Sequence, residues 1–515
     1  MASLRVRTVV LALGQFVHTG LTLVLAMVLS RLLQKEVYGT FREVLFIYML
    51  LAGVLGSNIA ESLLYFLPRS GAAEKRRWLG QTVQLSLVVG VVLGAIIYTT
   101  ADVWADHYTT PELASLLKVF AWFPLADRVV RLVPPALIAE DRALGAAVFT
   151  VVLAVAKLGS AIVPCMLGLS LAHVFWSMNA CWLVLAAVGV VVLGVRIGVA
   201  VHVPALANVK AQARYIWPLL AASIVGLLQE LFGHHVVLSS LSASDYADYA
   251  NGAFQLPIVG IWTSSIAAAI MPDLVRLGDG GERTAMLTLW HRAFRKGALV
   301  IFPVTVLALT VADQIITCFF GPAYVRSTLP FALYLLVLPA RAANYGVMFR
   351  AVGRNRAILI AAVFGLAANA VVTLTCVYWG RGTELVFVGP AIGYVAGAYA
   401  AVAVMVILLR GLVDIPLGRV IPFRDLAPLA ALALAAGFAG AATRLLPAAA
   451  WVAAASSMSL DNLQPVHVSI AAALRCVLAT LGFGIVFIGL GTALRVFDAS
   501  ERSLLRRAVF FIRRT

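Results

Sequence analysis

Residues 69–112, RSGAAEKRRWLGQTVQLSLVVGVVLGAIIYTTADVWADHYTTPE, decide the fold class of this chain. The stretch begins with a basic segment that contains Lys75, Arg76 and Arg77, and it continues through an apolar run over 81–102 into a gap with acidic residues but no base. An apolar run of about 20 residues is long enough to cross a bilayer as a helix. Lys and Arg resist translocation and gather in cytoplasmic loops. The stretch therefore predicts a membrane-spanning helix that begins on the cytoplasmic side.

The same alternation runs along the whole chain. It predicts about 14 spans, near 8–31, 43–67, 81–102, 113–138, 144–168, 172–195, 216–238, 251–272, 297–319, 328–349, 357–379, 387–409, 427–447 and 468–491. With Met1 in the cytoplasm, most of the 39 basic residues fall in cytoplasmic gaps and tails. The outward gaps hold only Arg31, Lys35, Arg42, Arg326, Arg381 and Arg444. We expect an all-α, multi-pass bacterial inner-membrane protein with cytoplasmic N- and C-termini.

The composition agrees with this class. Hydrophobic residues make up 62% of the chain, charged residues 12%, and the mean hydropathy is +0.98. Such a composition excludes a soluble globular domain. The net charge of +16 follows from the basic cytoplasmic loops and their attraction to anionic lipid headgroups. We therefore expect membrane lipids as partners, and no nucleic acid.

The gaps contain no sign of an extramembrane catalytic domain. The longest cytoplasmic gap, 272–296, includes the basic stretch WHRAFRK, for which we expect an interfacial amphipathic helix. No cluster has the spacing of zinc ligands, no GxxxxGK[ST] phosphate loop occurs, and no Ser/His/Asp arrangement is evident. We expect no enzyme activity, metal or cofactor, so the function must operate within the bilayer.

Two weak internal repeats predict a duplication. SLSASDYADY (240–249) echoes LLQKEVYGTF (32–41) at an offset of 208, and NRAILIAAVF (355–364) echoes DRALGAAVF (141–149) at an offset of 214 to 215. A six-helix unit repeated once gives parallel lobes with a substrate path between them. We expect an N-terminal lobe over 1–195, a cytoplasmic linker over 196–215 and a C-terminal lobe over 216–410. Residues 411–515 would add two further spans and a basic cytoplasmic tail.

These segments resemble the polysaccharide flippases of the multidrug/oligosaccharidyl-lipid/polysaccharide (MOP) exporter superfamily. In the first copy, LSRLLQKEVYGTF (29–41) is followed by a span that ends LYFLPRS (64–70). In the second, SASDYADYANGAFQLP (242–257) leads to IMPDLVRL (270–277), then to FFGPAYVRSTLPFALYLLVLP and AVGRNRAILIAAVFGLAANAVV. The resemblance covers roughly residues 1–410, and its order and spacing are more specific than any single element.

The resemblance implies a MATE-like bundle of two pseudo-symmetric lobes around a central cavity. It implies a transporter that flips a polyprenyl-pyrophosphate-linked oligosaccharide by alternating access, for O-antigen, capsule or exopolysaccharide biosynthesis. Spans 1, 2, 7 and 8 would line much of the cavity. A polysaccharide polymerase is a candidate partner, and a proton or cation a candidate coupling ion.

Such a substrate calls for arginine inside the membrane, because its planar guanidinium group binds phosphate through two hydrogen bonds. The span over 113–138 offers Asp127, Arg128 and Arg131. Arg131 lies about 16 Å inward from Arg142, at 1.5 Å per residue, and Pro134 and Pro135 should break the helix there. The alternative is that Asp127 pairs with an Arg while the other side chains snorkel to the headgroups.

Other polar residues in the spans complete the predicted site. Arg341 takes the place of Asp127 in the second copy, with Asn344 one turn further on. The predicted substrate-binding residues are Arg128, Arg131, Arg341, Asn344, Asn58, Glu61, His18 and Gln255. Lys118, Lys157 and Arg475 are weaker candidates. A lone His such as His18 is more often a packing residue than a ligand.

Glu230 and His234 form a candidate coupling pair. They lie four residues apart in the span over 216–238 and so share a helix face. The pair could exchange a proton as pH or membrane potential changes. The alternative is a hydrogen-bonded structural pair.

Three other functions compete with polysaccharide flipping. A peptidoglycan-precursor flippase would share the span number and an Arg-rich cavity. A cation-coupled drug exporter would have the same fold, but such proteins usually have 12 spans and an acidic residue in span 1. Span 1 of this chain has no acidic residue. A glycan polymerase or ligase would usually carry a large outward catalytic loop, which is also absent.

Overall fold

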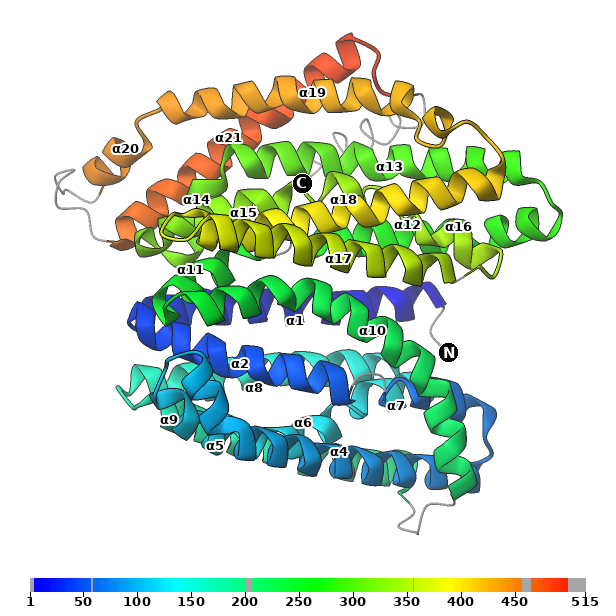
Figure 1. Ribbon diagram of the computed structural model, residues 1–515, viewed down its shortest axis with the longest axis vertical. Coiled ribbons are helices and arrows are strands. Elements are labelled where there is room, and N and C mark those ends of the chain that lie inside the picture. The colour runs from blue at the N-terminus through cyan, green and yellow to red at the C-terminus, as the bar shows by residue number, and fades with distance from the viewer. Residues whose placement is uncertain are drawn as a thin grey trace. The chain divides into compact units, whose positions relative to one another are not determined.

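The structure is a computed structural model that describes residues 4–56, 59–199, 206–254, 256–354, 356–455 and 465–498. Within these ranges every regular element is a helix (Figure 1). Eleven described helical segments are long and apolar enough to cross a membrane. They are Leu13–Leu32, Lys35–Leu55, Ala72–His107, Ala143–Met166, Leu171–Arg196, Arg283–Thr310, Pro322–Ala351, Arg356–Trp379, Leu385–Val413, Phe423–Leu445 and Pro465–Ala493. The prediction of an all-α, multi-pass membrane protein is confirmed.

The other three predicted spans are helical but are not among these eleven. Residues 113–138 form three short helices, α5 (Glu112–Phe120), α6 (Phe123–Val130) and α7 (Val133–Ala139). Residues 216–238 lie within α10 (Leu206–Ser240), and most of 251–272 lies within α12 (Pro257–Asp279). The number of 14 spans therefore stays a prediction.

The chain divides into two compact units, Met1–Ala247 and Asp248–Thr515. The first contains α1 (Leu4–Leu32), α2 (Lys35–Gly56), α3 (Ser62–Phe66), α4 (Ala72–His107), α5 to α7, α8 (Ala143–Met166), α9 (Leu171–Arg196) and α10. In it α1 packs against α8, α6 packs against α4 and α9, and α2 packs against α10. The predicted lobes were drawn from the sequence repeats, with limits at 195 and 216, and they stay a prediction.

A buried network of amide and hydroxyl groups fastens the start of α10 inside the first unit. The Gln212 amide donates to the hydroxyl groups of Ser62 and Thr82, at 2.8 and 3.0 Å. Its carbonyl accepts a hydrogen bond from Gln81 at 2.9 Å. All four side chains are buried, and buried polar groups are stable only when they are hydrogen-bonded. The second half of the predicted linker is thus helical and packs against α3 and α4.

The second unit contains the later helices. They are α12, α13 (Arg283–Thr310), α14 (Ala312–Phe320), α15 (Thr328–Leu335), α16 (Gly346–Ala351), α17 (Arg356–Trp379), α18 (Leu385–Val413), α19 (Phe423–Ala442), α20 (Ala448–Ala455) and α21 (Pro465–Ala493). Helix α11 (Ala243–Gly252) crosses the boundary between the units. Helices α17 and α18 form a hairpin, and α13 packs against α12 and α19. The C-terminal helices α19 and α21 pack against each other.

The stretch WHRAFRK is helical, as predicted, but it is not a helix of its own, and its place at the membrane interface stays a prediction. Residues 290–296 belong to α13, which is continuous from Arg283. The basic side chains donate to backbone carbonyls of the helices around them. Arg283 donates to the Leu412 carbonyl near the end of α18, and Arg295 donates to that of Val496 just after α21. Basic side chains at helix C-termini satisfy carbonyls that have no partner within the helix.

The helix boundaries repeat at the offset of the sequence echo. Helix α1 ends at Leu32 and α2 begins at Lys35, while α10 ends at Ser240 and α11 begins at Ala243. Both boundaries are thus 208 residues apart. Helices α8 and α17, which follow the second pair of echoes, have 24 residues each. These boundaries support the predicted duplication.

Candidate functional site

A broken helix in the first unit positions the predicted arginines. Helix α6 ends at Val130 and α7 begins at Val133. Pro134 and Pro135 have no N–H to donate to the carbonyls four residues earlier, and so the helix cannot continue through this point. The break that the two prolines predicted is confirmed. It leaves Arg131 directly after the end of α6, with its backbone N–H still bonded to the Asp127 carbonyl at 3.1 Å.

Asp127 is the centre of a hydrogen-bonded group, which we call the Asp127 cluster. Its carboxylate accepts hydrogen bonds from Arg128 Nη2 at 2.9 Å, Arg131 Nε at 2.6 Å and Trp182 Nε1 at 3.2 Å. The Tyr48 hydroxyl also donates to it, and Arg128 Nη2 lies 2.9 Å from that hydroxyl oxygen. The cluster joins α2, α6 and α9.

The two arginines of the cluster differ in exposure. The Arg128 side chain is 7% exposed, whereas that of Arg131 is 58% exposed. Arg128 is therefore enclosed with Asp127, and its contacts fix the carboxylate. Arg131 is held at one end by the same carboxylate, while its guanidinium group is presented at the surface of the unit. An arginine fixed in this way is pre-organised to bind an anion.

Further basic groups surround the exposed end of Arg131. Lys157 of α8 lies close enough to interact electrostatically with both Arg131 and Asp127. His18 of α1 lies within electrostatic range of Arg131 and Lys157, and its Nδ1 is 3.4 Å from the Thr150 carbonyl oxygen. Arg128, Arg131, Lys157 and His18 thus lie near one carboxylate. This region of the first unit has more basic side chains than acidic ones, which suits a phosphate group.

The second unit has a related arrangement. Helix α15 ends at Leu335 and α16 begins at Gly346, with a short 3-10 turn, Pro339–Arg341, between them. Arg341 is exposed and donates to the Tyr394 hydroxyl at 2.6 Å. The Tyr394 ring stacks on that of Tyr334, with centroids 4.7 Å apart. In each unit, an exposed arginine therefore stands at the break of a helix.

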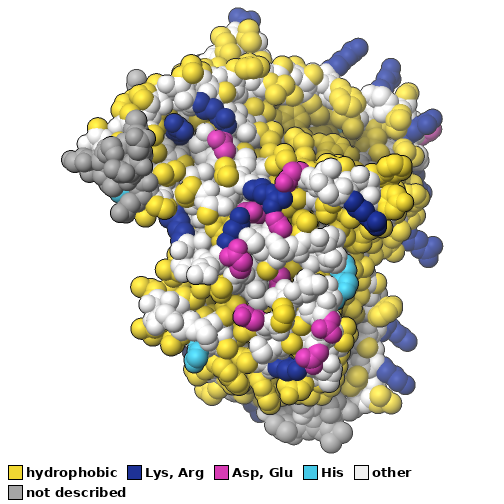
Figure 2. All heavy atoms as spheres, turned by 60° about the vertical axis from the view of Figure 1, so that its left-hand side comes forward, with side chains coloured by type: hydrophobic (Ala, Val, Ile, Leu, Met, Phe, Trp, Pro, Cys, Tyr) yellow, Lys and Arg dark blue, Asp and Glu magenta, His cyan; other side chains and the backbone are white. Residues whose placement is uncertain are grey.

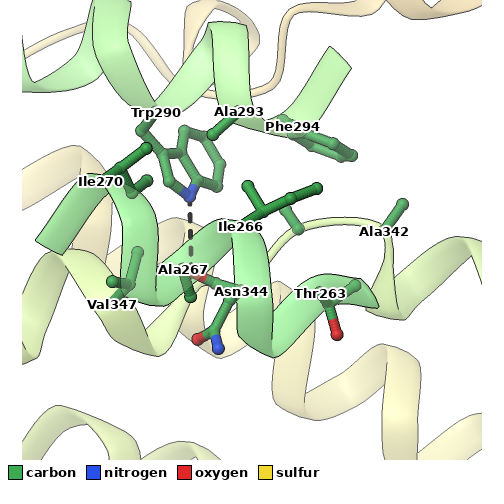
Figure 3. Close-up of a pocket in the computed structure, with 11 residues that line it drawn as sticks. Thr263, Ile266, Ala267, Ile270, Trp290, Ala293, Phe294, Ala342, Asn344 and Val347 are labelled. Carbon is green, nitrogen blue, oxygen red and sulfur yellow. Dashed lines mark hydrogen bonds between the residues drawn. The ribbon is translucent and has the colours of Figure 1, made fainter. Parts of the chain in front are cut away.

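Asn344 is held by neighbours in the second unit. Its side-chain oxygen accepts from Arg350 at 3.1 Å, and its backbone carbonyl accepts from the Trp290 indole at 3.4 Å. Figure 3 shows the hydrogen bond between the Trp290 indole and the Asn344 carbonyl, at a pocket that residues of α12 and α13 also line. No charged residue lines the pocket, so it is unsuited to a pyrophosphate.

The remaining predicted residues are not brought to the Asp127 cluster by any described contact. Glu61 is exposed and precedes α3. Glu230 is exposed on α10, whereas the His234 ring stacks on Phe46 and its Nδ1 lies 3.3 Å from the Tyr246 hydroxyl. Asn58 and Gln255 lie outside the described residues. In the part of the chain that the structure describes, no three His, Cys, Asp or Glu side chains gather as a metal site.

Sequence reasoning missed two members of this site and ranked a third too low. Tyr48 and Trp182 lie 79 and 55 residues from Asp127, and nothing in their local sequence sets them apart from other aromatic residues in spans. Lys157 was ranked as a weak candidate. Its position inside an apolar span was the signal that could have raised it, because a lysine in a span is rare and usually functional.

Figure 2 shows Asp, Glu, Lys and Arg side chains among large hydrophobic areas on the face in view. Such hydrophobic areas are expected for a protein that lies in lipid. The ion pairs Lys118–Asp102, Arg326–Glu384 and Arg444–Asp313 each have one partner in a gap that the sequence places outward.

Comparisons with known proteins identify the family of the chain. Residues 5–277 match a family model described as "Polysaccharide biosynthesis protein". No match was found among curated protein sequences.

Solved structures of similar fold come from membrane transporters. A structure titled "Lipid II flippase MurJ, inward closed conformation" is 12% identical, covers 93% of this chain and 98% of its own, and has a TM-score of 0.69. An inward-facing multidrug resistance MATE family transporter of the MOP superfamily is 17% identical, covers 77% and 94%, and has a TM-score of 0.60. A MOP superfamily transporter from Pyrococcus furiosus is 18% identical, covers 79% and 95%, and has a TM-score of 0.54. These likenesses show that the chain has the MOP-superfamily fold.

Proposed function

Because the chain belongs to the polysaccharide biosynthesis protein family, we propose that it flips a polyprenyl-pyrophosphate-linked oligosaccharide outward across the inner membrane. The protein acts by alternating access and catalyses no covalent reaction. Its product supplies O-antigen, capsule or exopolysaccharide assembly.

The observation that carries this proposal is the pre-organised arginine of the Asp127 cluster. Arg131 is fixed by the Asp127 carboxylate yet is 58% exposed, with Lys157 and His18 nearby. Ionised groups at membrane depth are costly and usually serve a function. A pyrophosphate carries two negative charges and accepts several hydrogen bonds, which matches a site with more basic groups than acidic ones.

Within this proposal the side chains have distinct roles. Arg131 binds a phosphate oxygen, and Lys157 adds charge that attracts the anion. Arg128, Tyr48 and Trp182 are positioning residues, since they hold Asp127, which in turn orients Arg131. In the second unit, Arg341, held by Tyr394, is a further proposed contact of the pyrophosphate. Asn344, Asn58, Glu61 and Gln255 remain proposed contacts of the glycan.

A second candidate substrate is a lipid-linked peptidoglycan precursor. The observation in its favour is the fold of the lipid II flippase, whose alignment covers 93% of this chain. Both substrates would present a pyrophosphate to Arg131, so the two functions differ in the glycan and in the pathway that they serve.

Deleting the gene distinguishes these substrates. We expect the deletion strain to lose surface polysaccharide, to accumulate its lipid-linked oligosaccharide and to keep growing, because peptidoglycan precursors still reach the outside. Thin-layer chromatography of extracted lipids and staining of the surface glycan measure this outcome. A strain that lyses while its surface polysaccharide is intact would contradict the proposal and support the peptidoglycan precursor instead. The chain expressed from a plasmid is the control and should restore the glycan.

A further inference from the structure

A buried carboxyl group lies in the first unit, apart from the Asp127 cluster. Glu43 of α2 is 1% exposed, and its Oε2 atom has no hydrogen-bond partner. The Thr110 side chain lies close to this carboxyl group. No salt bridge to a described Lys or Arg neutralises it. A buried acid without a counter-charge is rare, and a buried polar atom without a partner calls for an explanation.

Three residues that can carry a proton lie near Glu43 or near one another: Tyr108, His235 and the exposed His107. Tyr108, in the turn after α4, is close enough to interact electrostatically with Glu43. Its hydroxyl lies 2.9 Å from Nδ1 of His235 on α10. The His235 ring stacks on that of His107, with centroids 5.5 Å apart, and His107 is exposed. Imidazole and phenol groups both donate and accept protons.

The helices around Glu43 carry other charged groups, and two of these, Lys118 and Arg42, bind other partners. Lys118 of α5 pairs with Asp102 of α4 at 2.9 Å, and Arg42 of α2 donates to the Tyr38 hydroxyl at 3.3 Å. The remaining titratable groups at this end of α2 and on the helices packed against it are Arg31, Lys35, Glu36, Asp106, Glu112 and His234. None of these groups forms a described contact with the carboxyl group of Glu43.

Helix α10 packs closely along α2 in this region. A Cβ atom added at Gly39 would collide with the backbone of Ala243, and one added at Gly53 would collide with Leu227. Gly39 therefore leaves room for the start of α11, where Ala243 lies, and Gly53 leaves room for the Leu227 side chain of α10. Tyr108 lies within electrostatic range of the Glu43 carboxyl group, and its hydroxyl is hydrogen-bonded to His235 of α10. A change of charge at Glu43 would thus be felt at the contact between α2 and α10.

We propose that Glu43 is a proton-binding site that His107, His235 and Tyr108 connect to the outer side, and that its protonation controls the packing of α10 on α2. Water on that side supplies the proton, which ends on a carboxylate oxygen of Glu43, and deprotonation returns it by the same route. Burying an ionised carboxylate without a counter-charge is costly, so close packing of α10 on α2 is coupled to proton uptake by Glu43. Proton binding at Glu43 does not depend on the proposed function; only its expected effect on transport rests on that function.

Infrared spectroscopy of the purified full chain tests proton binding without any substrate. A pH titration in detergent should show a protonated carboxyl band in the wild-type protein and lose that band in Glu43→Gln. Glu36→Gln is the matched control, because Glu36 lies on the same helix but is exposed, and it should keep the band. The neutral amide of Glu43→Gln resembles the protonated acid in shape, so the variant should fold. A spectrum of Glu43→Gln identical to that of the wild type would overturn the proposal.

The consequence for transport has its own measurement. In vesicles with an imposed pH gradient, transport by Glu43→Gln should become independent of pH, and His235→Gln should slow the response by about tenfold or more. If transport by Glu43→Gln keeps the wild-type pH dependence while Glu230→Gln loses it, the coupling site is on α10 and the proposal is wrong. Arg131→Ala distinguishes the proposed flippase function from the Glu43 proton site, since it should lose transport and keep the infrared band of Glu43.

Discussion

Replacing Asp127 by Ala should destabilise the protein by about 3–5 kcal/mol, because the change leaves buried charge without a partner. Four side chains donate hydrogen bonds to this carboxylate: Tyr48, Arg128, Arg131 and Trp182. Arg128 is the most affected, since its guanidinium group is almost completely enclosed. Unfolding by heat or denaturant in detergent, followed by tryptophan fluorescence, measures the change.

The ion pair between Lys118 and Asp102 is the matched control. Its side chains are 37% and 66% exposed, and exposed pairs contribute about 0–1 kcal/mol. Asp102→Ala should therefore leave the stability almost unchanged. If Asp127→Ala were as stable as Asp102→Ala, the Asp127 cluster would not hold the first unit together in the way we describe.

Replacing Arg131 by Ala should abolish export while leaving the fold intact. The side chain is largely exposed, so its removal creates no buried cavity. Each lost charge-assisted hydrogen bond to phosphate removes about 1.5–3 kcal/mol, and two such bonds lower affinity by about a hundredfold or more. Arg131→Lys should restore only part of the activity, because an ammonium group cannot bind a phosphate through two parallel hydrogen bonds. The amount of surface polysaccharide in the complemented deletion strain measures export.

Arg326 provides the control for this second prediction. It is also partly exposed and paired with a carboxylate, Glu384, at 2.9 Å, but it lies in a predicted outward gap rather than at the break of a helix. Arg326→Ala should export normally. Equal export by Arg131→Ala and Arg326→Ala, at equal protein levels, would remove Arg131 from the proposed site.

Charge and hydropathy were enough to predict the membrane class, because helices in a bilayer must satisfy their own backbone hydrogen bonds. The arginines at the break between α6 and α7 could be predicted for a similar reason, since charge within an apolar stretch next to two prolines is visible in the sequence. The aromatic side chains that complete their hydrogen-bonded cluster could not be predicted. Tyr48 and Trp182 contact Asp127 only because α2, α6 and α9 pack together, and packing between distant segments leaves no local pattern.

Glu43 was missed for a different reason. The apolar stretch of span 2 was predicted to begin at residue 43, which would place this acid at the membrane boundary. Helix α2 begins at Lys35, about two turns earlier at 3.6 residues per turn, and Glu43 is buried against other parts of the first unit. Hydropathy locates the apolar part of a helix, but not the polar turns that extend it.

Flipping of a defined substrate by the reconstituted protein tests the central claim most directly. The full chain would be placed in vesicles with a fluorescent polyprenyl-pyrophosphate-linked oligosaccharide, and the fraction that becomes accessible to an impermeant quencher would be followed with time. We predict rapid flipping by the wild-type protein and a rate close to that of protein-free vesicles for Arg131→Ala. Wild-type vesicles that flip no faster than protein-free ones, or Arg131→Ala vesicles that match the wild type, would contradict the account.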